Sequence, residues 1–441
     1  MENGCEKDKI LLMSVGELNM GTGLVDRYIN IERKKIYGVL YYIAMIIYLP
    51  MMLCSISYLQ PELGESGMRL LHHARIVAYL ILLFIVGDTA LRDLLTGLRN
   101  KSFLSPGQLV LMLALFISVV SAYISKKSEA FVIMLIIAAA IDVKPDTRKL
   151  FALIAAMQFA SIPVFWYLTV RGVLPDSQEY AVDLMRHSFG FAYVTFAPML
   201  QLFISMEYIY FRNIRKISLT ELGILLDINI VLYKYCKSRN SMLIFTVVFA
   251  AALLYKLVPD VIDRVIALLS KFMGLLMALI FAVSFIGPYI FTHFYKGDVS
   301  RGLGSIAARF YLSYEAMQRY RVITLFGQKI DWEAPLLSSN KDGYVFVDNA
   351  YLHGLLDFGI IYFILMLLIY MVILRIFRQR KEFMNYFMIV MILCLSVIDP
   401  RLWVLVFNPF PMLISEGYEE MIAEISAQLK KRGKSSVVSS R

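Results

Sequence analysis

Long apolar stretches separated by short polar ones run along most of this chain. Four of them, residues 36–58, 150–170, 188–206 and 272–295, contain no Asp, Glu, Lys or Arg. About 20 consecutive apolar residues are enough for a helix to cross a bilayer. The pattern therefore predicts about twelve membrane spans, at residues 36–58, 74–91, 104–125, 130–142, 150–170, 188–211, 219–235, 240–257, 264–295, 355–374, 383–398 and 400–415.

Two of these stretches fit a full span less well than the others. The stretch at 130–142 is short, and the stretch at 400–415 contains Asn408, Pro409 and Pro411. Irregular backbone is tolerated at membrane depth only where neighbouring protein satisfies its polar groups. Either stretch is compatible with a re-entrant segment, which leaves a range of eleven to thirteen spans.

Composition agrees with this pattern. The chain has 441 residues, of which 59% are hydrophobic and 18% charged, and its mean hydropathy is +0.66. Soluble domains have about 45–50% apolar and about 25% charged residues. We therefore expect an all-α, polytopic integral membrane protein. The four cysteines form no CxxC pair or even framework, so they indicate neither a zinc site nor a disulfide scaffold.

The net charge of +10 is spread over many short loops, which favours contact with anionic membrane lipid and gives no reason to expect nucleic acid. Cytoplasmic loops are enriched in Lys and Arg, and this bias predicts that both termini are cytoplasmic. The expected divisions are cytoplasmic tails at 1–35 and 416–441, spans at 36–295 and 355–415, and external loops at 171–187 and 296–354. A basic cluster at 234–239 runs against the bias.

The external loop 296–354 is the only long polar segment between spans. Within it, apolar side chains recur every three or four residues, which predicts an amphipathic helix, at Ile306, Phe310, Tyr314, Met317 and Tyr320. One interpretation is a helix that packs at the membrane surface. The other is a phosphate-binding surface, because guanidinium groups match phosphate oxygens in a bidentate way, formed by Arg301, Arg309, Arg319 and Arg321.

Three shorter motifs also carry candidate site residues. Arg186 to Phe191 and Lys237 to Asn240 lie at two outer span ends, where each Arg either binds phosphate or extends to lipid headgroups. The pair Asp348-Asn349 precedes the span at 355–374. A carboxylate there can accept a proton from a hydroxyl, whereas Asp or Asn before a helix can also cap its free N–H groups.

In their order, these motifs resemble the Wzy-type polysaccharide polymerases, which share a superfamily with the O-antigen ligases. The resemblance covers roughly 186–377. The matching segments are Arg186-His187-Ser188-Phe189-Gly190-Phe191, the span from Glu221 through Asn229 to Ser238-Arg239, Ala308-Arg309-Phe310, Leu325-Phe326-Gly327, and Asp348-Asn349-Ala350-Tyr351-Leu352 to Gly359. The ligases and some polymerases have His-Asn at the position of Asp348-Asn349, so His187 and His353 are alternative bases.

The resemblance implies a GT-C-like glycosyltransferase in the bacterial cytoplasmic membrane that needs neither metal nor cofactor. Its substrate would be undecaprenyl-diphosphate-linked oligosaccharide, joined into a surface polysaccharide at the outer face. A chain-length regulator and a flippase would be its protein partners. The implied roles are catalysis by Asp348 and Arg309, and substrate binding by Arg186, His187, Arg239, Arg301, Asn349, Tyr351 and His353.

Two alternatives remain open at this point. A ligase would transfer finished glycan to another acceptor, and the sequence separates it poorly from a polymerase. A lipid-linked-sugar flippase is the other alternative. Many secondary transporters are built from repeated halves, and no internal repeat is visible in this chain, which weighs against the flippase.

Overall fold

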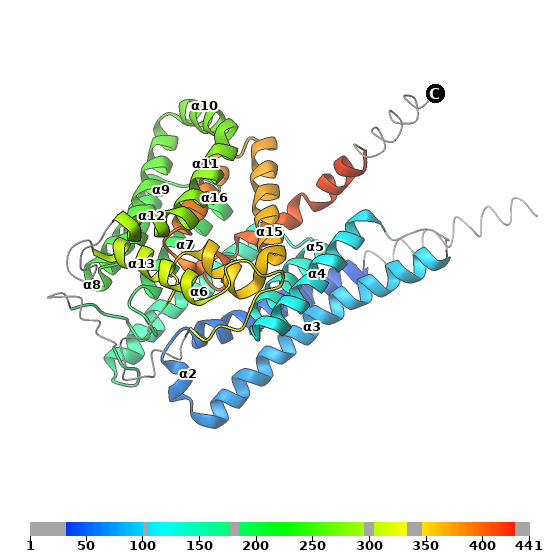
Figure 1. The fold of residues 1–441 in the computed structure, drawn as a ribbon, viewed down its shortest axis with the longest axis horizontal. Coiled ribbons are helices and arrows are strands. Elements are labelled where there is room, and N and C mark those ends of the chain that lie inside the picture. The colour runs from blue at the N-terminus through cyan, green and yellow to red at the C-terminus, as the bar shows by residue number, and fades with distance from the viewer. Residues whose placement is uncertain (1–31, 100–104, 177–184, 295–303, 333–345, 428–441) are drawn as a thin grey trace, which may run out of the picture.

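A computed structural model describes residues 32–99, 105–176, 185–294, 304–332 and 346–427. These residues are all-helical and form no β-strand; one isolated bridge joins Ser57 to Phe191. The expected all-α class is confirmed. After a first helix at Glu32–Ser55, the α-helices of Figure 1 are α2 (Leu59–Glu62), α3 (Gly64–Arg99), α4 (Pro106–Ser125), α5 (Glu129–Val143), α6 (Thr147–Val170), α7 (Phe196–Arg212), α8 (Leu219–Cys236), α9 (Arg239–Leu257), α10 (Pro259–Leu269), α11 (Met273–Phe281), α12 (Gly287–Phe294), α13 (Gly304–Arg319), α15 (Ala350–Gln379) and α16 (Phe383–Leu395).

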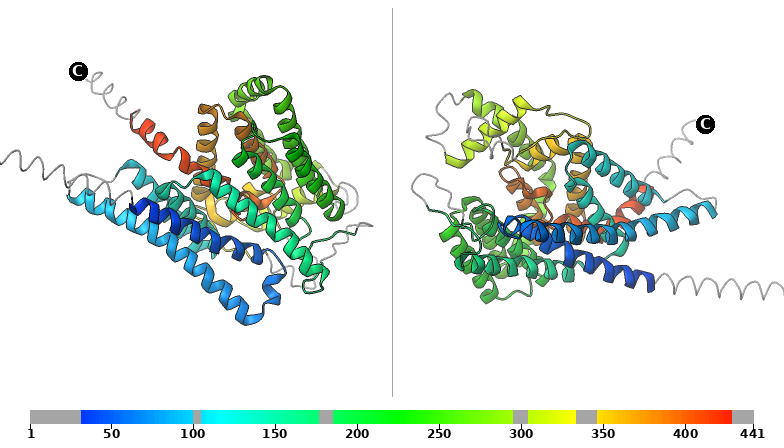
Figure 2. Two further views of the ribbon diagram at one scale, coloured as in Figure 1. Left: turned by 180° about the vertical axis from the view of Figure 1, so that it is seen from behind. Right: turned by 90° about the horizontal axis from the view of Figure 1, so that it is seen from below.

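Within the described residues, seven helices are long and apolar enough to cross a membrane. They are Glu32–Ser55, Gly64–Arg99, Pro106–Ser125, Thr147–Val170, Arg239–Leu257, Pro259–His293 and Ala350–Gln379. Each overlaps a predicted span. Figures 1 and 2 show α3 as a long helix that extends past the rest of the bundle.

Local sequence explains where several helices begin. The Ser105 hydroxyl accepts a hydrogen bond from the Gln108 backbone N–H, and the Gln108 side chain accepts one from the Ser105 N–H. Ser218 and Glu221 form the same reciprocal pair before α8. Because the first N–H groups of a helix lack partners in the helix itself, such capping boxes fix its start.

Two predicted spans differ from the structure. Residues 188–195 precede α7 as irregular backbone, because Phe189 and Gly190 have φ of 55° and 78°. Residues 400–415 form 3₁₀ turns at Pro400–Trp403 and Phe410–Glu416 in place of a continuous helix. Prolines interrupt helical hydrogen bonding there, and the turns are buried inside the protein, so a spanning helix at 400–415 was a wrong expectation.

The helices α7, α9, α15 and α16 form one packed group. The helix α9 packs against α7 and α16, and α16 packs against α15. With 19 residues, α9 is about 28 Å long, close to the thickness of a bilayer's hydrocarbon core. The two ends of this group are therefore separated by roughly one membrane thickness.

The amphipathic helix expected in the loop 296–354 is present as α13. Its apolar stripe contacts protein: the Phe310 ring lies 5.8 Å from Phe291, and the Tyr314 ring lies 6.2 Å from Tyr289, both between centroids. Further along the stripe, Met317 packs on a separate apolar cluster around Trp332. The stripe thus faces α12 and the following loop, and its contact with the membrane surface stays a prediction.

The helix α15 is broken near its start. Gly359 has φ 81° and ψ 171°, so residues 350–358 form a short helix distinct from the long one that follows. The preceding loop completes the break, because Thr324 O accepts a hydrogen bond from Ile360 N at 2.8 Å and Leu325 O accepts one from Ile361 N at 3.2 Å. A Cβ on Gly359 would lie 2.3 Å from Gly327 N. The backbone of the motif ending in Gly327 therefore packs directly against the backbone of Gly359, where no side chain fits.

Candidate functional site

The two residues expected to be catalytic lie in direct contact. On α13, Nε of Arg309 is 2.8 Å from Oδ2 of Asp348, and Nη1 donates to Ile398 O at 2.7 Å. With its carboxamide oxygen turned toward the guanidinium, Asn240 accepts a hydrogen bond from Nη2 at 3.2 Å. The Arg309 and Asp348 side chains are 19% and 27% exposed. This ion pair therefore joins α9, α13, α15 and the end of α16 while remaining open to solvent.

A second ion pair lies next to it. Arg401 and Asp399 are both buried, and their side chains form an ion pair. Nη2 of Arg401 also donates to the Thr195 hydroxyl at 2.9 Å. The guanidinium lies over the rings of Phe196 and Phe407, at 4.8 and 5.0 Å from their centroids. These contacts fix the start of α7 against the segment after α16.

The two ion pairs influence each other electrostatically. Burial raises the pKa of the Asp399 carboxyl, and the nearby Arg401 and Arg309 cations oppose that rise. The Asp348 carboxylate adds to the rise. We call Asn240, Arg309, Asp348, Asp399 and Arg401 the open cluster.

The Arg186 motif lies at the neighbouring helix junction. Nη2 of Arg186 donates to Lys237 O at 3.0 Å, and His187 N donates to Tyr235 O at 3.2 Å. His187 Nδ1 is 2.5 Å from Oδ2 of Asp176. The motif is thus attached to the C-terminal end of α8, just before the turn that begins α9.

Asp176 and Gly190 determine the shape of this motif. The other Asp176 oxygen accepts hydrogen bonds from the backbone N–H groups of Ser188 and Phe189, at 2.8 and 3.2 Å. A Cβ on Gly190 would lie 2.7 Å from the Thr169 hydroxyl, so only glycine fits this left-handed turn. Gly190 belongs to the motif that the sequence singled out, whereas Asp176 was not identified.

Arg239 is the first residue of α9 and directly precedes Asn240 of the open cluster. Its side chain is exposed, and it makes no hydrogen bond or ion pair with the residues that the structure describes. Arg186 contacts the Lys237-Ser238 turn and Arg239 follows it, and the next residue, Asn240, contacts Arg309. Three of the expected phosphate-binding arginines thus come from adjoining segments.

The remaining expected site residues have other surroundings. Arg301 lies outside the described residues. Asn349 is 2% exposed and caps α15: its Oδ1 accepts from Tyr351 N and Leu352 N at 3.0 and 3.2 Å, and its Nδ2 donates to Ser284 O at 3.0 Å. The Tyr351 hydroxyl is buried and donates to Leu393 O at 2.7 Å. The capping interpretation of Asn349 is confirmed, and substrate contact by Asn349 or Tyr351 stays a prediction.

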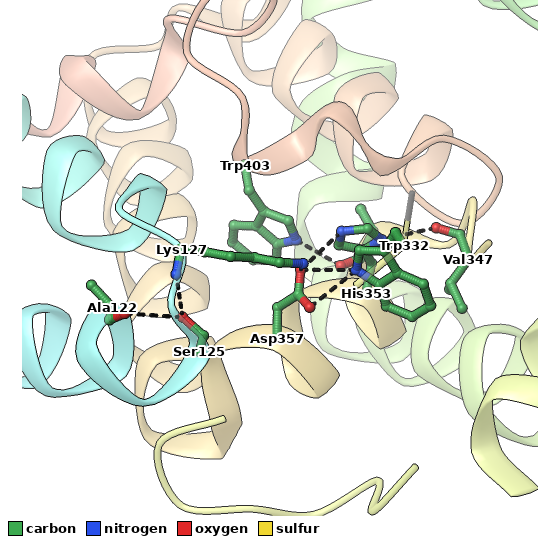
Figure 3. Close-up of polar contacts among 9 residues, drawn as sticks. Ala122, Ser125, Lys127, Trp332, Val347, His353, Asp357 and Trp403 are labelled. Carbon is green, nitrogen blue, oxygen red and sulfur yellow. Dashed lines mark hydrogen bonds and ion pairs between the residues drawn. The ribbon is translucent and has the colours of Figure 1, made fainter. Parts of the chain in front are cut away.

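His353 belongs to a separate, buried cluster (Figure 3). Oδ2 of Asp357 lies 2.6 Å from Lys127 Nζ and 3.1 Å from His353 Nε2. Trp332 Nε1 donates to the same carboxylate at 3.1 and 3.2 Å, and its ring stacks on His353 with 5.0 Å between centroids. The Asp357 side chain is 2% exposed. We call Lys127, Trp332, His353 and Asp357 the buried cluster.

The buried cluster holds the broken part of α15 in place. Lys127 comes from the α4–α5 turn, Trp332 from the loop after α13, and the other two residues from the short helix 350–358. The second His353 nitrogen, Nδ1, is 3.1 Å from Val347 O. Because both ring nitrogens have protein partners, this arrangement supports a structural role for His353 more directly than a role as a base.

Sequence reasoning missed Asn240, Asp399, Arg401, Lys127 and Asp357 as members of charged clusters. A signal existed for Asp357, which stands four residues after His353 inside an apolar stretch, where charged residues usually have a partner. Among the described residues, no three His, Cys, Asp or Glu side chains form a metal-ligand group. The open cluster can bind an anion through its cations and can accept a proton at Asp348.

In comparisons with known proteins, no family model, no curated protein and no solved structure matches this chain.

Proposed function

We propose that this protein is a membrane glycosyltransferase that polymerises undecaprenyl-diphosphate-linked oligosaccharide repeat units into a surface polysaccharide. The proposal combines the resemblance of the motifs between Arg186 and Gly359 with the chemistry of the open cluster. The observation that carries it is the solvent-accessible Arg309–Asp348 pair, with Arg186 and Arg239 on adjoining segments. A lipid diphosphate needs cations, and a sugar hydroxyl needs a proton acceptor; this region offers both.

The chemistry requires one bond to form and one to break. The acceptor sugar hydroxyl attacks the anomeric carbon of the donor, the bond from that carbon to the diphosphate oxygen breaks, and the hydroxyl proton passes to Asp348. The lipid diphosphate leaves with the bonding electron pair. Positioned cations stabilise the negative charge that develops on the leaving group, a role we assign to Arg309 with Arg186 and Arg239.

The Arg309–Asp348 ion pair can serve this reaction as a resting state. A diphosphate has more negative charge than one carboxylate and offers a bidentate match to the guanidinium. Donor binding would therefore compete with Asp348 for Arg309. The carboxylate released from Arg309 is then able to orient the acceptor hydroxyl and take its proton.

The finer topology belongs to the same proposal. We place the open cluster at the outer face of a bacterial cytoplasmic membrane, with both termini cytoplasmic. We also propose a GT-C-like fold of about twelve spans. The spans beyond the seven long apolar helices would be formed by shorter helices. A flippase would deliver the lipid-linked repeat units, and a chain-length regulator would limit the polymer.

A deletion strain complemented with variants tests the proposal. Cells without the protein should accumulate single lipid-linked repeats and make no long polymer, whereas loss of a ligase would leave finished polymer unattached. Arg309→Ala and Asp348→Ala should each abolish polymer formation at unchanged membrane levels of the protein. Normal polymer length in the deletion strain would refute the proposal.

The matched control is Arg69→Ala. Arg69 and Glu65 form an exposed ion pair at 3.6 Å near the start of α3, so this change removes an Arg from a salt bridge far along the chain from the open cluster. Polymer formation should stay at the wild-type level in this control. In reconstituted vesicles, transbilayer movement of lipid-linked sugar without new glycosidic bonds would instead assign the protein to the flippases.

A further inference from the structure

The four helices that position the open cluster also form a pocket at their opposite ends. The open cluster contacts the starts of α7, α9 and α15 and the end of α16. The ends of α7, α9 and α15 and the start of α16 surround a pocket of about 340 Å³. On α9, Asn240 of the open cluster and Tyr255 of the pocket are 15 residues apart, which separates the two regions by about 22 Å along this helix.

The lining of this pocket is polar and mostly basic. Its polar side chains include Asn213, Arg215, Tyr255, Arg380, Lys381 and Asn385. Glu382 is the one acidic side chain among the lining residues, and its Oε2 accepts a hydrogen bond from Asn385. Three cations and one carboxylate give the lining a net positive charge.

The three cations differ in how firmly the protein holds them. Arg380 forms an ion pair with Glu416 and also donates to Glu416 O, so its charge is largely offset. Arg215 keeps 70% of its side chain exposed, and its contacts are long: 3.3 Å from Nε to the Tyr255 hydroxyl and 3.7 Å from Nη2 to Asp263. Arg215 therefore retains most of its capacity to bind an anion.

Lys381 is held at the pocket by its backbone. Its φ is 57°, a left-handed turn after α15 like those that Lys126, Lys144 and Lys237 form after α4, α5 and α8. The side chain is exposed and forms no ion pair or hydrogen bond with the residues that the structure describes.

We propose that this pocket binds a phosphate group, supplied by the headgroup of an anionic phospholipid in the leaflet opposite the open cluster. Arg215 and Lys381 would contact the phosphate oxygens, with the Asn213 amide beside them in the lining. A volume of about 340 Å³ lies within the range of small-ligand sites. This spacing of about 22 Å covers most of a hydrocarbon core of about 30 Å, so the pocket lies near headgroup level when the open cluster lies at the other surface.

The test is lipid binding by the purified protein in neutral detergent, followed by native mass spectrometry during titration with phosphatidylglycerol or phosphatidylcholine. Phosphatidylglycerol should bind more tightly. Arg215→Ala/Lys381→Ala should weaken its binding about thirtyfold, from the typical contribution of each cation near an anionic membrane surface. Lys381→Gly keeps a residue suited to the left-handed turn, so it removes one charge without loss of stability and should weaken binding about fivefold.

The control Arg148→Ala/Lys149→Ala removes two exposed cations from the start of α6, whose Thr147 also contacts Glu416 and so lies at the same end of the molecule. This control should bind phosphatidylglycerol as the wild type does. Equal binding by wild type and the Arg215/Lys381 variant, or equal weakening in the control, would overturn the proposal. Glycerol 3-phosphate and inorganic phosphate serve as soluble competitors of phosphatidylglycerol. If either displaced the lipid at a concentration similar to that of the lipid, the pocket would be a phosphate site, and the assignment to a lipid headgroup would be overturned.

Discussion

The open and buried clusters both centre on an aspartate near the start of α15, yet their surroundings differ. Asp348 is 27% exposed and has one charged partner, Arg309, which is itself 19% exposed. Asp357 is 2% exposed, and Lys127, His353 and Trp332 occupy both of its oxygens. Only the first aspartate can change partners without unfolding its surroundings.

The difference in exposure separates an aspartate that is able to bind a ligand from one that stabilises the fold. Ion pairs open to solvent contribute little to stability, so the Arg309–Asp348 pair can exchange partners at small cost to the fold. A buried carboxylate with several partners is different, because removing one partner leaves a desolvated charge behind. The sequence motif around residues 348–359 therefore contains one end that can exchange partners and one end that is structural.

The largest expected effect is that of Asp357→Asn. The substitution takes the charge from the buried Asp357 side chain and leaves the partly exposed Lys127 without its partner, so we expect a loss of about 3 kcal/mol in unfolding free energy. Thermal unfolding in detergent and the membrane level of the protein would measure it. A variant as stable as the wild type would show that the buried cluster does not hold α15.

A double variant separates the lost charge from lost packing. Lys127→Met combined with Asp357→Asn removes both charges, so it should recover part of the stability that Asp357→Asn loses. If the double variant were less stable than either single variant, the Lys127–Asp357 pair would not be the source of the effect.

Gly359→Ala should cause the next largest loss of stability. Its φ of 81° is strained for alanine, and the new Cβ would lie 2.3 Å from Gly327 N, so a loss of about 2 kcal/mol or more is expected. Thermal unfolding measures it. The matched control is Gly223→Ala in α8, where a Cβ meets no atom within 4 Å and helix propensity favours alanine. If the two substitutions had equal effects on stability, the close backbone packing at Gly359 would not stabilise the break in α15.

Asn349→Ala should have a smaller effect on stability. It removes the α15 cap and the donor to Ser284 O, and such caps contribute about 1 kcal/mol. Polymer formed per folded protein should stay close to wild type if Asn349 acts only as a cap. A large loss of polymer at near-normal stability would instead support the substrate contact that the sequence predicts.

Arg309→Lys should change stability least and still affect the reaction. Lysine keeps the charge but loses the planar fork that spans Asp348, Ile398 O and Asn240. We expect less than about 1 kcal/mol of destabilisation and a rise of about tenfold in KM for the lipid-linked donor. An unchanged KM would show that the guanidinium does not bind the diphosphate.

Hydropathy predicted the long helices well and failed where buried backbone is irregular. The expected spans at 104–125, 150–170 and 240–257 end within about three residues of α4, α6 and α9, since uniform apolar sequence has few other stable arrangements in a membrane. Residues 400–415 are equally apolar but pack inside the protein as turns. Hydropathy measures burial and does not distinguish lipid from protein as the surroundings.

The candidate site was predictable only in part. Arg309 and Asp348 were each singled out, and they are in contact. The partners Asp399 and Arg401, and the Lys127–Asp357 pair 230 residues apart in sequence, depend on helix packing that one sequence does not contain. Residue types thus indicated the chemistry, while tertiary structure decided which charges meet.

The most direct test of the account is polymer formation per folded protein for Asp348→Asn beside Asp357→Asn, with purified protein and isolated lipid-linked repeat units. Asp348→Asn should fold with stability within about 1 kcal/mol of wild type and lose at least about a hundredfold in rate, the usual contribution of a general base. Asp357→Asn should lose folded protein while the remaining folded fraction keeps most of its activity. Wild-type rates from folded Asp348→Asn would contradict the central claim that the open cluster is the catalytic one.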